Sequence, residues 1–202
     1  MRVGIIVDGD AESQALRLLT RRLMIQGTNI MDPVYANMQP KATAKQIARA
    51  AKATADILLV RGAERLIILI DREDRQECCS SLAAALQHGF ETLGLAVDVV
   101  IKNKQFENWL VADPAVFLRL KRLFKASTKI SKQVLPDRAD LITDPVALLD
   151  ALRRDVPYHK RKDAAVIAEA MDEMAAASNS RSFRRFLRLL NHPNYLLQSR
   201  TP

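Results

Sequence analysis

Carboxylates follow two short apolar segments of the chain, and their spacing indicates a cation site. The N-terminal apolar run ends at Asp8, and the sequence DGDAE places Glu12 four residues later. The run RLIILI ends at Asp71, and Glu73 follows two residues later in the sequence IDREDR. Carboxylates that are crowded together repel and raise one another's pKa. A hard divalent cation such as Mg²⁺, which prefers oxygen ligands, would offset that repulsion.

Neighbouring acids have simpler interpretations as helix caps. Asp10 and Asp74 each precede a segment with helical periodicity, so we predict that their side chains cap the N-termini of those helices. Glu12 falls in the first turn of the first predicted helix, where the helix dipole favours an anion. The acids that we expect to bind metal, with Mg²⁺ or Mn²⁺ as the cofactor, are therefore Asp8, Glu12, Asp71 and Glu73.

A regular alternation of strands and helices in the first half of the chain positions these acids. Short β-branched runs predict strands, and stripes of Leu and Ala predict helices between them. Such an alternation gives an α/β fold, with a parallel sheet of about four strands flanked by helices. Ligands of these sheets bind outside the carboxyl ends of the strands, where Asp8 and Asp71 lie. We expect strands over 3–7, 33–38, 65–70 and 95–101, separated by helices over 11–25, 41–60 and 76–92.

The second half of the chain is expected to be helical and basic. Residues 1–113 hold 14 Lys and Arg against 14 Asp and Glu, whereas residues 114–202 hold 17 against 9, so the later part carries the whole net charge of +8. We therefore divide the chain into an α/β core, 1–113, and a basic helical C-terminal extension packed on it, 114–202. Helices are predicted over 106–112, 114–125, 146–154, 163–177 and 182–190, with a loop over 129–144.

The composition argues against several classes of protein. Hydrophobic residues make up 49% and charged residues 27%, which is typical of a globular chain and not of a disordered one. No apolar run approaches the ~20 residues that a membrane-spanning helix needs, and the N-terminus lacks the pattern of a signal peptide. The cysteines are two adjacent residues, Cys78 and Cys79, so we expect neither a disulfide framework nor a zinc cluster and predict a cytoplasmic protein.

Two basic segments of the extension are candidate polyanion-binding surfaces. Around the helix over 182–190, arginines recur at helical spacing opposite Phe183 and Phe186. That row would track a phosphate backbone or dock an acidic partner, while the sequence HKRK is by default a solvated run of charge. The basic residues that we expect to bind nucleic acid are Lys160, Arg161, Lys162, Arg181, Arg184, Arg185 and Arg188.

The order of these motifs resembles a known fold family. An acid at the end of the first strand (DGDAE) and an acidic pair after the third (DRE) are similar to the motifs of Toprim domains, the metal-dependent fold of topoisomerases, primases and OLD-type nucleases. The later sequences FENWLVADP, YHKRKD and SRSFRRFLRLL strengthen the likeness, which extends from Val3 to Leu190. Together they resemble a bacterial Toprim-like family of unknown function, related to OLD-type nucleases, whose members often neighbour an ATPase gene.

The resemblance implies an activity and assigns roles to particular residues. OLD-type nucleases hydrolyse phosphodiester bonds of DNA or RNA with acids around one or two metal ions and a later lysine near the scissile phosphate. By that likeness Glu107 would complete a second metal site, and Lys160 would stabilise charge on the phosphate in the transition state. The chain would be the effector of an ATPase-linked antiphage defence system, with the ATPase as its partner. The catalytic metal ligands that it implies are Asp8, Glu12, Asp71 and Glu73.

Other interpretations of the same residues stay open. The first-strand acid is Asp8 where the Toprim pattern usually has Glu, and Glu73 replaces the second Asp of D-x-D, so the chain could be a catalytically inactive binding subunit of an ATPase complex. The sequence IIVDGDAES also resembles the first motif of haloacid-dehalogenase phosphatases, with Asp8 as nucleophile and Asp10 as the acid/base. Without the resemblance, Glu107 and Trp109 would simply be features of a packed helix.

Overall fold

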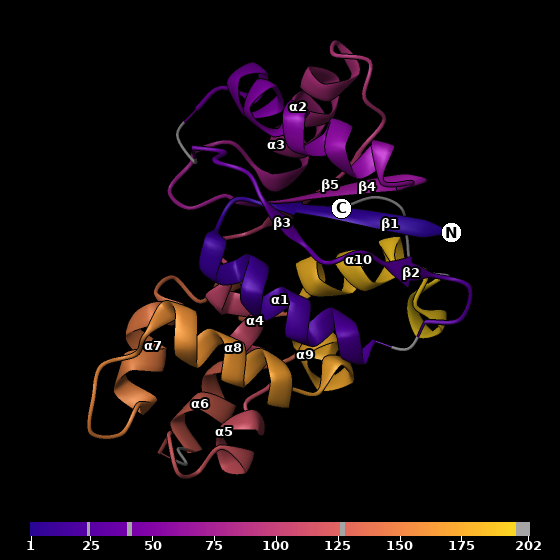
Figure 1. Cartoon of the computed structure of the whole chain (residues 1–202). Helices are drawn as coiled ribbons and strands as arrows, with labels where there is room; N and C mark the ends of the chain where they lie inside the picture. Colours follow the sequence, from indigo (N-terminus) through magenta and orange to yellow (C-terminus); the bar gives the residue numbers. More distant parts are fainter. Residues whose placement is uncertain (24, 40–41, 126–127, 197–202) are drawn as a thin grey trace.

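A five-stranded parallel sheet forms the centre of the chain in a computed structural model, which describes residues 1–23, 25–39, 42–125 and 128–196 (Figure 1). The strands are ordered β2-β1-β4-β5, β3 also pairs with β1, and every pairing is parallel. The predicted α/β class, with a parallel sheet flanked by helices, is therefore confirmed. The strands are β1 (Arg2–Val7), β2 (Asn29–Ile30), β3 (Val34–Tyr35), β4 (Arg65–Asp71) and β5 (Asp98–Lys102).

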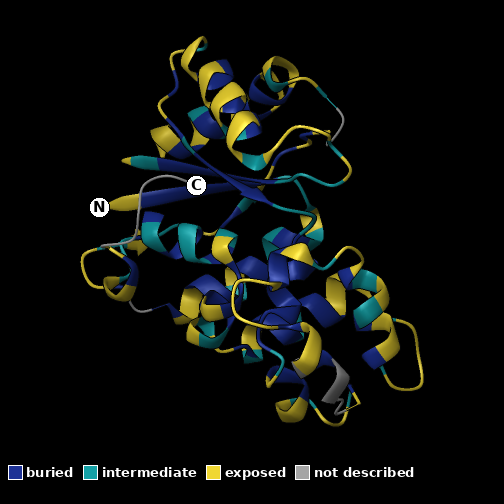
Figure 2. Cartoon of the chain, turned by 180° about the vertical axis from the view of Figure 1, so that it is seen from behind, coloured by how far each residue is buried: buried dark blue, intermediate teal, exposed yellow. Residues whose placement is uncertain are grey.

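Both faces of the sheet are buried, which explains why its strands are apolar runs without polar alternation. Successive residues of a strand point to opposite faces, so β1 directs Val3 and Ile5 into one hydrophobic cluster and Ile6 into another. At Gly4 an added Cβ would lie 3.0 Å from Leu66 Cδ2 and 3.2 Å from Leu58 Cδ1, so a larger residue would force these leucine side chains of β4 and α2 to shift. Figure 2 shows the sheet as a buried layer between helices.

Two helices cover each face of the sheet (Figure 1). On one face lie α2 (Ala44–Val60) and α3 (Cys79–Glu91), and on the other lie α1 (Asp10–Arg22) and α10 (Arg181–Leu189). Helix α2 begins with a capping box, in which the Thr43 side chain accepts from the Gln46 backbone and the Gln46 side chain accepts from the Thr43 backbone. Helix and sheet together hold the carboxyl ends of β1, β4 and β5 at one edge.

The remaining helices extend the layer that contains α1 and α10. Their apolar side chains join the cluster that also contains Val3, Ile5 and Val7, so the basic extension and the sheet share one hydrophobic core. Helix α8 packs along α1 and thereby brings the extension beside the first acids of the chain. These helices are α4 (Glu107–Val111), α5 (Val116–Arg119), α6 (Thr128–Gln133), α7 (Pro145–Leu152), α8 (Lys160–Ala170) and α9 (Glu173–Asn179), with 3-10 turns at Ala139–Leu141 and Pro193–Tyr195.

Three predictions about the extension were wrong. The segment expected to be a helix over 114–125 forms only the short helix α5, and Phe124 instead pairs with Arg153 in an isolated antiparallel bridge. The segment expected to be one helix over 163–177 is two, because the chain is extended at Met171 and the Asp172 side chain accepts from the backbone of Met174 and Ala175 to start α9. The segment expected to be a loop over 129–144 instead contains most of α6 and a 3-10 turn. Short polar helices of this kind carry little apolar periodicity, so the sequence pattern does not reveal them.

No helix among the described residues is long and apolar enough to cross a membrane.

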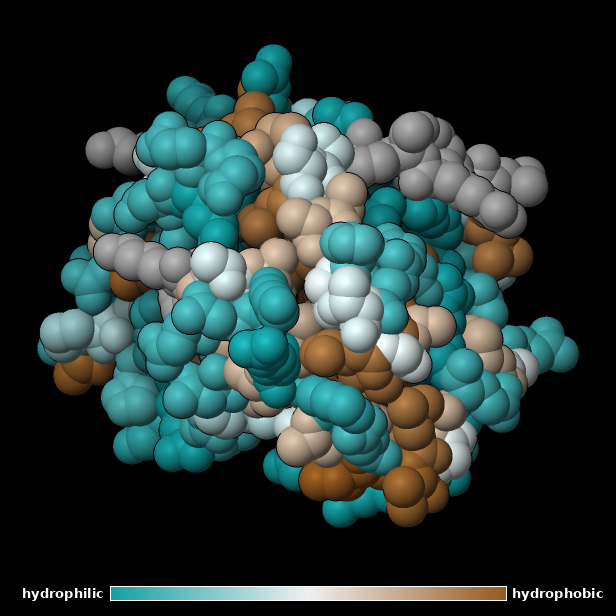
Figure 3. All heavy atoms as spheres, turned by 90° about the horizontal axis from the view of Figure 1, so that it is seen from above, coloured by the Kyte–Doolittle hydropathy of each residue, from teal (hydrophilic) through white to brown (hydrophobic). Residues whose placement is uncertain are grey.

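From the side of α2 and α3 the surface is largely hydrophilic, with hydrophobic residues gathered toward one edge (Figure 3). Apolar residues at the end of α2 are exposed, with Val60 at 89%.

Trp109 anchors the layer of helices beneath the sheet. Its ring is fully buried, lies 5.0 Å from the ring of Phe183 edge to face, and stacks at 5.4 Å on Phe186. Its indole Nε1 donates a hydrogen bond of 2.7 Å to Ser182 Oγ, which satisfies its polar atom. The interpretation of Trp109 as a core residue of a packed helix therefore holds, and α4 is fixed to α10 through it.

We expect Trp109→Ala to lower the free energy of unfolding by about 3 to 5 kcal/mol, because it leaves a cavity among three aromatic rings. Trp109→Phe should cost less, since it keeps most of the volume and loses the bond to Ser182. Urea unfolding followed by far-ultraviolet circular dichroism measures both, with Leu118→Ala, whose side chain is exposed, as the control. An equal loss in the control and in Trp109→Ala would contradict the assignment of Trp109 as the anchor.

Candidate metal centre

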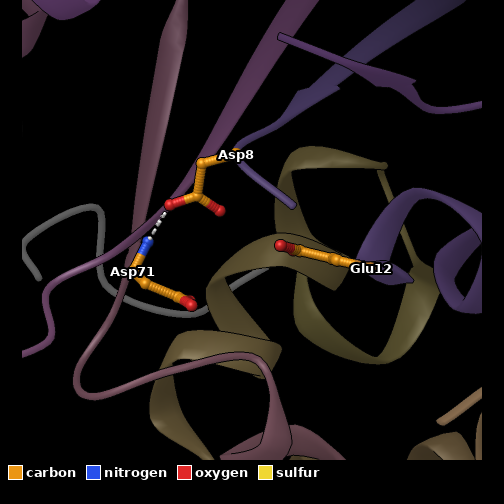
Figure 4. Close-up of side chains that lie close together, drawn as sticks. All are labelled: Asp8, Glu12 and Asp71. Atoms are coloured by element: carbon orange, nitrogen blue, oxygen red, sulfur yellow. Dashed lines mark hydrogen bonds between the residues drawn. The ribbon is translucent and has the colours of Figure 1, made fainter. Parts of the chain in front are cut away.

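Three of the predicted metal ligands converge at the carboxyl edge of the sheet (Figure 4). Asp8 directly follows β1, Asp71 is the last residue of the neighbouring strand β4, and Glu12 lies in the first turn of α1. One carboxylate oxygen from each lies within 4.8 Å of the others. The backbone N–H of Asp71 donates a hydrogen bond of 2.8 Å to Asp8 Oδ2, which fixes the first carboxylate against the second strand.

A buried lysine that sequence reasoning missed lies among these carboxylates. Lys102 ends β5 and pairs in register with Asp71, so it occupies the same edge as the acids. Its side chain is 0% exposed. The ammonium Nζ lies 3.2 Å from Asp8 Oδ1, 2.5 Å from Glu12 Oε2 and 2.9 Å from Asp71 Oδ1. The usable signal was its place at the carboxyl end of a strand, because the predicted parallel sheet brings that end to the same edge as the strand ends that carry Asp8 and Asp71.

The charges of this cluster shift one another's protonation. Burial raises the pKa of Glu12 well above its usual range, although Lys102 opposes the shift. Burial also raises the pKa of Asp71, to about 7, with Lys102 again opposing and Asp8 and Glu107 adding to the shift. Burial alone would lower the pKa of Lys102, but the surrounding carboxylates outweigh it and raise that pKa well above its usual range. The cluster therefore holds protons that free carboxylates would release.

The donor set fits a hard divalent cation. Glu12 Oε1 is buried without a hydrogen-bond partner in the described structure. Asp71 Oδ1 likewise accepts no hydrogen bond there, because Lys102 approaches it at ion-pair distance but in a direction unsuited to hydrogen bonding. Three carboxylates and one ammonium, all ionised, leave a net charge of −2, which one divalent cation balances. Oxygen-only ligands are those that Mg²⁺ and Mn²⁺ prefer.

Glu107 and Lys160 lie together next to this cluster. Glu107, the first residue of α4, is 5% exposed, and its Oε1 is 3.6 Å from Lys160 Nζ at the start of α8. It is near enough to contribute to the raised pKa of Asp71, yet it lies outside the set of three carboxylates. Tyr158, also missed by sequence reasoning, has a buried hydroxyl without a hydrogen-bond partner among the described residues. Burial and then Glu107 raise the pKa of Tyr158.

Glu73 is not brought to the three carboxylates in the described structure. It lies in the turn after β4 with a left-handed φ of 50°, and its backbone N–H donates to the carbonyl of Lys104. Because the backbone turns after β4 ends, the side chain of Glu73, the second acid of the D-x-D-like motif, does not join Asp71 in the cluster.

The two predicted N-caps were wrong. Gly9 holds the N-cap position of α1, and Asp10 is the first helical residue, paired with Arg161 at 2.8 Å. Helix α3 begins only at Cys79, so Asp74 lies in the preceding turn with a 95% exposed side chain, 3.7 Å from Lys104. In both cases the helix starts at a position different from the one that the periodicity indicated.

The basic residues expected to bind nucleic acid fall into two places. Lys160, Arg161 and Lys162 open α8 with exposed side chains beside Glu107 and α1. The other group lies on α10, which packs against β5, and it lines a cleft along that strand. Members of this second group are Arg181, Arg184, Arg185 and Arg188.

Comparison with known proteins places the chain in one family. Residues 7–191 match the family described as "Domain of unknown function (DUF4276)", and the chain belongs to that family. The match begins at the last residue of β1 and ends just after α10, so it includes the carboxylates, Lys102 and the arginine row. No curated protein and no solved structure matches the chain.

We predict that folding becomes less favourable as the pH rises from about 4 to 7. In the folded chain Asp71 has a pKa of about 7 instead of 3.8, so it keeps a proton in this window that the unfolded chain has lost. Glu12 acts in the same direction, because its pKa is also raised. The effect of Asp71 on the free energy of unfolding has an upper limit of roughly 3 to 4 kcal/mol.

Urea unfolding in EDTA at several pH values tests this expectation. Asp71→Asn should flatten the pH dependence, because the amide resembles the neutral carboxyl group. Asp74→Asn, which changes a carboxylate with a 95% exposed side chain, should leave the dependence as in the wild type. A wild-type stability that rises over this window, or an unchanged slope in Asp71→Asn, would contradict the buried, proton-holding cluster.

Proposed function

We propose that the chain is a metal-dependent nuclease with a Toprim-like core, related to OLD-type nucleases. The observation that carries the proposal is the convergence of Asp8, Glu12 and Asp71 at the carboxyl edge of the parallel sheet, with two buried carboxylate oxygens that lack hydrogen-bond partners among the described residues. Ligand sites of such sheets lie at this edge. The cation that we propose is Mg²⁺ or Mn²⁺, held by these three residues.

The chain's own residues support phosphodiester hydrolysis. A bound cation would lower the pKa of a water molecule and stabilise a leaving oxygen. Lys102 holds the carboxylates together and reduces their mutual repulsion. The side chain of Lys160 is 58% exposed, and its Nζ lies 3.6 Å from Glu107 Oε1. In the proposed mechanism this ammonium would neutralise charge on the scissile phosphate. Burial raises the pKa of Asp71 to about 7 in the metal-free chain, so binding of a cation there would displace a proton from it near neutral pH.

Charge favours a polyanionic substrate over a small neutral one. The net charge is +8, carried by the extension that packs α8 against α1 beside the acids. Arg161 lies on that helix, 2.8 Å from Asp10, so a cation borders the candidate centre on this side. The proposal also includes a role as the effector of an antiphage defence system with an ATPase partner, and this part rests on the sequence resemblance alone. Action in the cytoplasm is part of the proposal as well and rests on the cysteine usage.

Cleavage of supercoiled plasmid and of total RNA by the purified chain tests the activity. We expect cutting with Mg²⁺ or Mn²⁺, none with EDTA, and loss of cutting in Asp71→Ala, because that variant removes a central ligand. Asp74→Ala is the matched control, since it removes an exposed carboxylate three residues away. Circular dichroism should show that Asp71→Ala stays folded, because the change also relieves repulsion. Cutting that persists in Asp71→Ala would overturn the assignment of the centre.

A second candidate function is a catalytically inactive binding subunit of an ATPase complex. The specific observation that favours it is Lys102, whose ammonium contacts all three carboxylates and could serve as their permanent counter-ion. The haloacid-dehalogenase alternative has less support, because it needs Asp10 beside Asp8 as the acid/base. Asp10 lies outside the cluster of three carboxylates and pairs with Arg161.

Lys102→Met separates the two candidates. The change removes the buried cation and leaves three carboxylates facing one another, so in EDTA we expect a loss of about 3 to 5 kcal/mol in the free energy of unfolding. If the centre binds a divalent cation, Mn²⁺ should stabilise the wild type and should restore much of the stability that the variant lost. The control is Lys104→Met, which removes a nearby, partly exposed lysine paired only at 3.7 Å with Asp74.

Thermal unfolding with Mn²⁺ and with EDTA gives the readout, and electron paramagnetic resonance counts bound Mn²⁺. With all four groups ionised the net charge of the cluster is −2, so we expect one bound ion in the wild type. Absence of Mn²⁺ binding in both wild type and variant would reject the metal centre and favour the inactive subunit.

A further inference from the structure

An arginine-rich cleft runs along the edge strand of the sheet, apart from the three carboxylates. Strand β5 ends the strand order, and α10 packs beside it. The cleft between them and the turn at Ala139–Leu141 has a volume of about 800 Å³. Five arginines line it, four from α10 and one from the loop before the turn: Arg138, Arg181, Arg184, Arg185 and Arg188.

The cleft is built from fixed groups. Arg184 pairs with Asp137 and donates to the carbonyl of Ala177 at 2.5 Å, and Arg185 donates to the carbonyl of Val99 on β5 at 3.3 Å. The second acid of the cleft, Asp140, is already satisfied within the protein, because the backbone N–H of Ser182 and the hydroxyls of Ser180 and Ser182 donate to it. The arginines therefore hold a positive lining that the two acids do not cancel.

Two of the arginines are available to a ligand. Arg138 and Arg181 have exposed side chains, and no ion pair or side-chain hydrogen bond of theirs is seen within the part of the chain that the structure describes. Apolar side chains form part of the wall, with Ile101 and Val99 from β5 and Leu141, which is 53% exposed, from the turn. Asn103 and Ser182 add neutral polar groups to it. The cleft thus offers cations on its rim and an apolar surface below them.

We propose that this cleft binds a short segment of single-stranded nucleic acid, with phosphates on the arginines and bases against the apolar wall. The inference rests on the proposed nuclease function and names its substrate as single-stranded. At about 800 Å³ the cleft is within the size range of sites for drug-sized ligands, which suits a segment of a single strand but not a duplex. The cleft also reaches Asn103, the residue after β5, so one end of it lies at the edge of the sheet where the strands that carry the three carboxylates also end.

The lining predicts how such a strand is held. No aromatic side chain lines the cleft in the described structure, so base stacking of the kind found in other single-strand-binding proteins is absent there. Binding would depend on phosphate contacts, which makes it steeply dependent on salt and tolerant of base sequence. An acidic polypeptide would meet the same arginines, so competition by a poly-glutamate peptide is the measurement that separates the two occupants.

Fluorescence anisotropy of short labelled single strands of DNA and RNA, measured in EDTA, tests the proposal without any metal chemistry. The test variant is the double substitution Arg138→Ala and Arg181→Ala, and the control carries Arg17→Ala and Arg49→Ala, which remove exposed arginines from α1 and α2. We expect the test variant to raise Kd about five- to thirty-fold. The slope of log K against log salt should fall by about 1.4, at roughly 0.7 for each lost phosphate contact. The control should match the wild type.

Three results would overturn the proposal. These are an unchanged Kd in the test variant, a duplex that binds as tightly as a single strand and with the same arginine dependence, and a poly-glutamate peptide that competes as well as the oligonucleotide. The last result would make the cleft a docking surface for an acidic partner. Failure of the nuclease function and failure of the cleft proposal give different results. If the chain is not a nuclease, the single strand should still bind through the arginines, but no metal-dependent cutting should be seen. If the cleft does not bind the substrate, cutting should be the same with and without Arg138 and Arg181.

Discussion

The buried contact between one ammonium group and three carboxylates is the constraint on which this structure depends. Charges removed from water are costly unless they are paired, and Lys102 pairs with Asp8, Glu12 and Asp71 at once. These four residues come from the ends of three adjacent strands and from the first turn of α1. The register of the sheet and the start of the helix must therefore both be correct before the charges can meet.

Packing around the sheet serves this constraint. The apolar residues of β1 and β4 bury both faces, which leaves the strand ends as the place where polar groups gather. Helix α8 lies against α1 and brings Lys160 to Glu107, so the basic extension completes one side of the site. Helix α10 lies on the same face and lines the edge strand with arginines, so the extension provides both groups of cations.

Sequence patterns were sufficient for the elements that periodicity defines and insufficient for contacts between distant elements. Apolar runs ending in acids predicted β1, β4 and the meeting of Asp8 with Asp71, because the carboxyl ends of parallel strands share an edge. The two-residue strand β2 was not predicted, because it is too short to show a pattern. Lys102 was missed because its position at a strand end does not show that its side chain is buried, and only the folded structure brings its ammonium to the three carboxylates. Glu73 was expected beside Asp71 from spacing alone, but its left-handed backbone turns the chain away.

The single tryptophan gives this molecule a built-in optical probe. Trp109 lies two residues after Glu107, its indole bonds to Ser182 next to Arg181, and its edge-to-face neighbour Phe106 lies under the ammonium of Lys102 at 5.8 Å. One chromophore thus contacts the helix that carries the arginine row, and only the ring of Phe106 separates it from the ammonium of Lys102 at the acidic edge. Its emission would report on events at either place without any added label, and energy transfer to a dye on a bound strand would measure how far that strand lies from the protein's core.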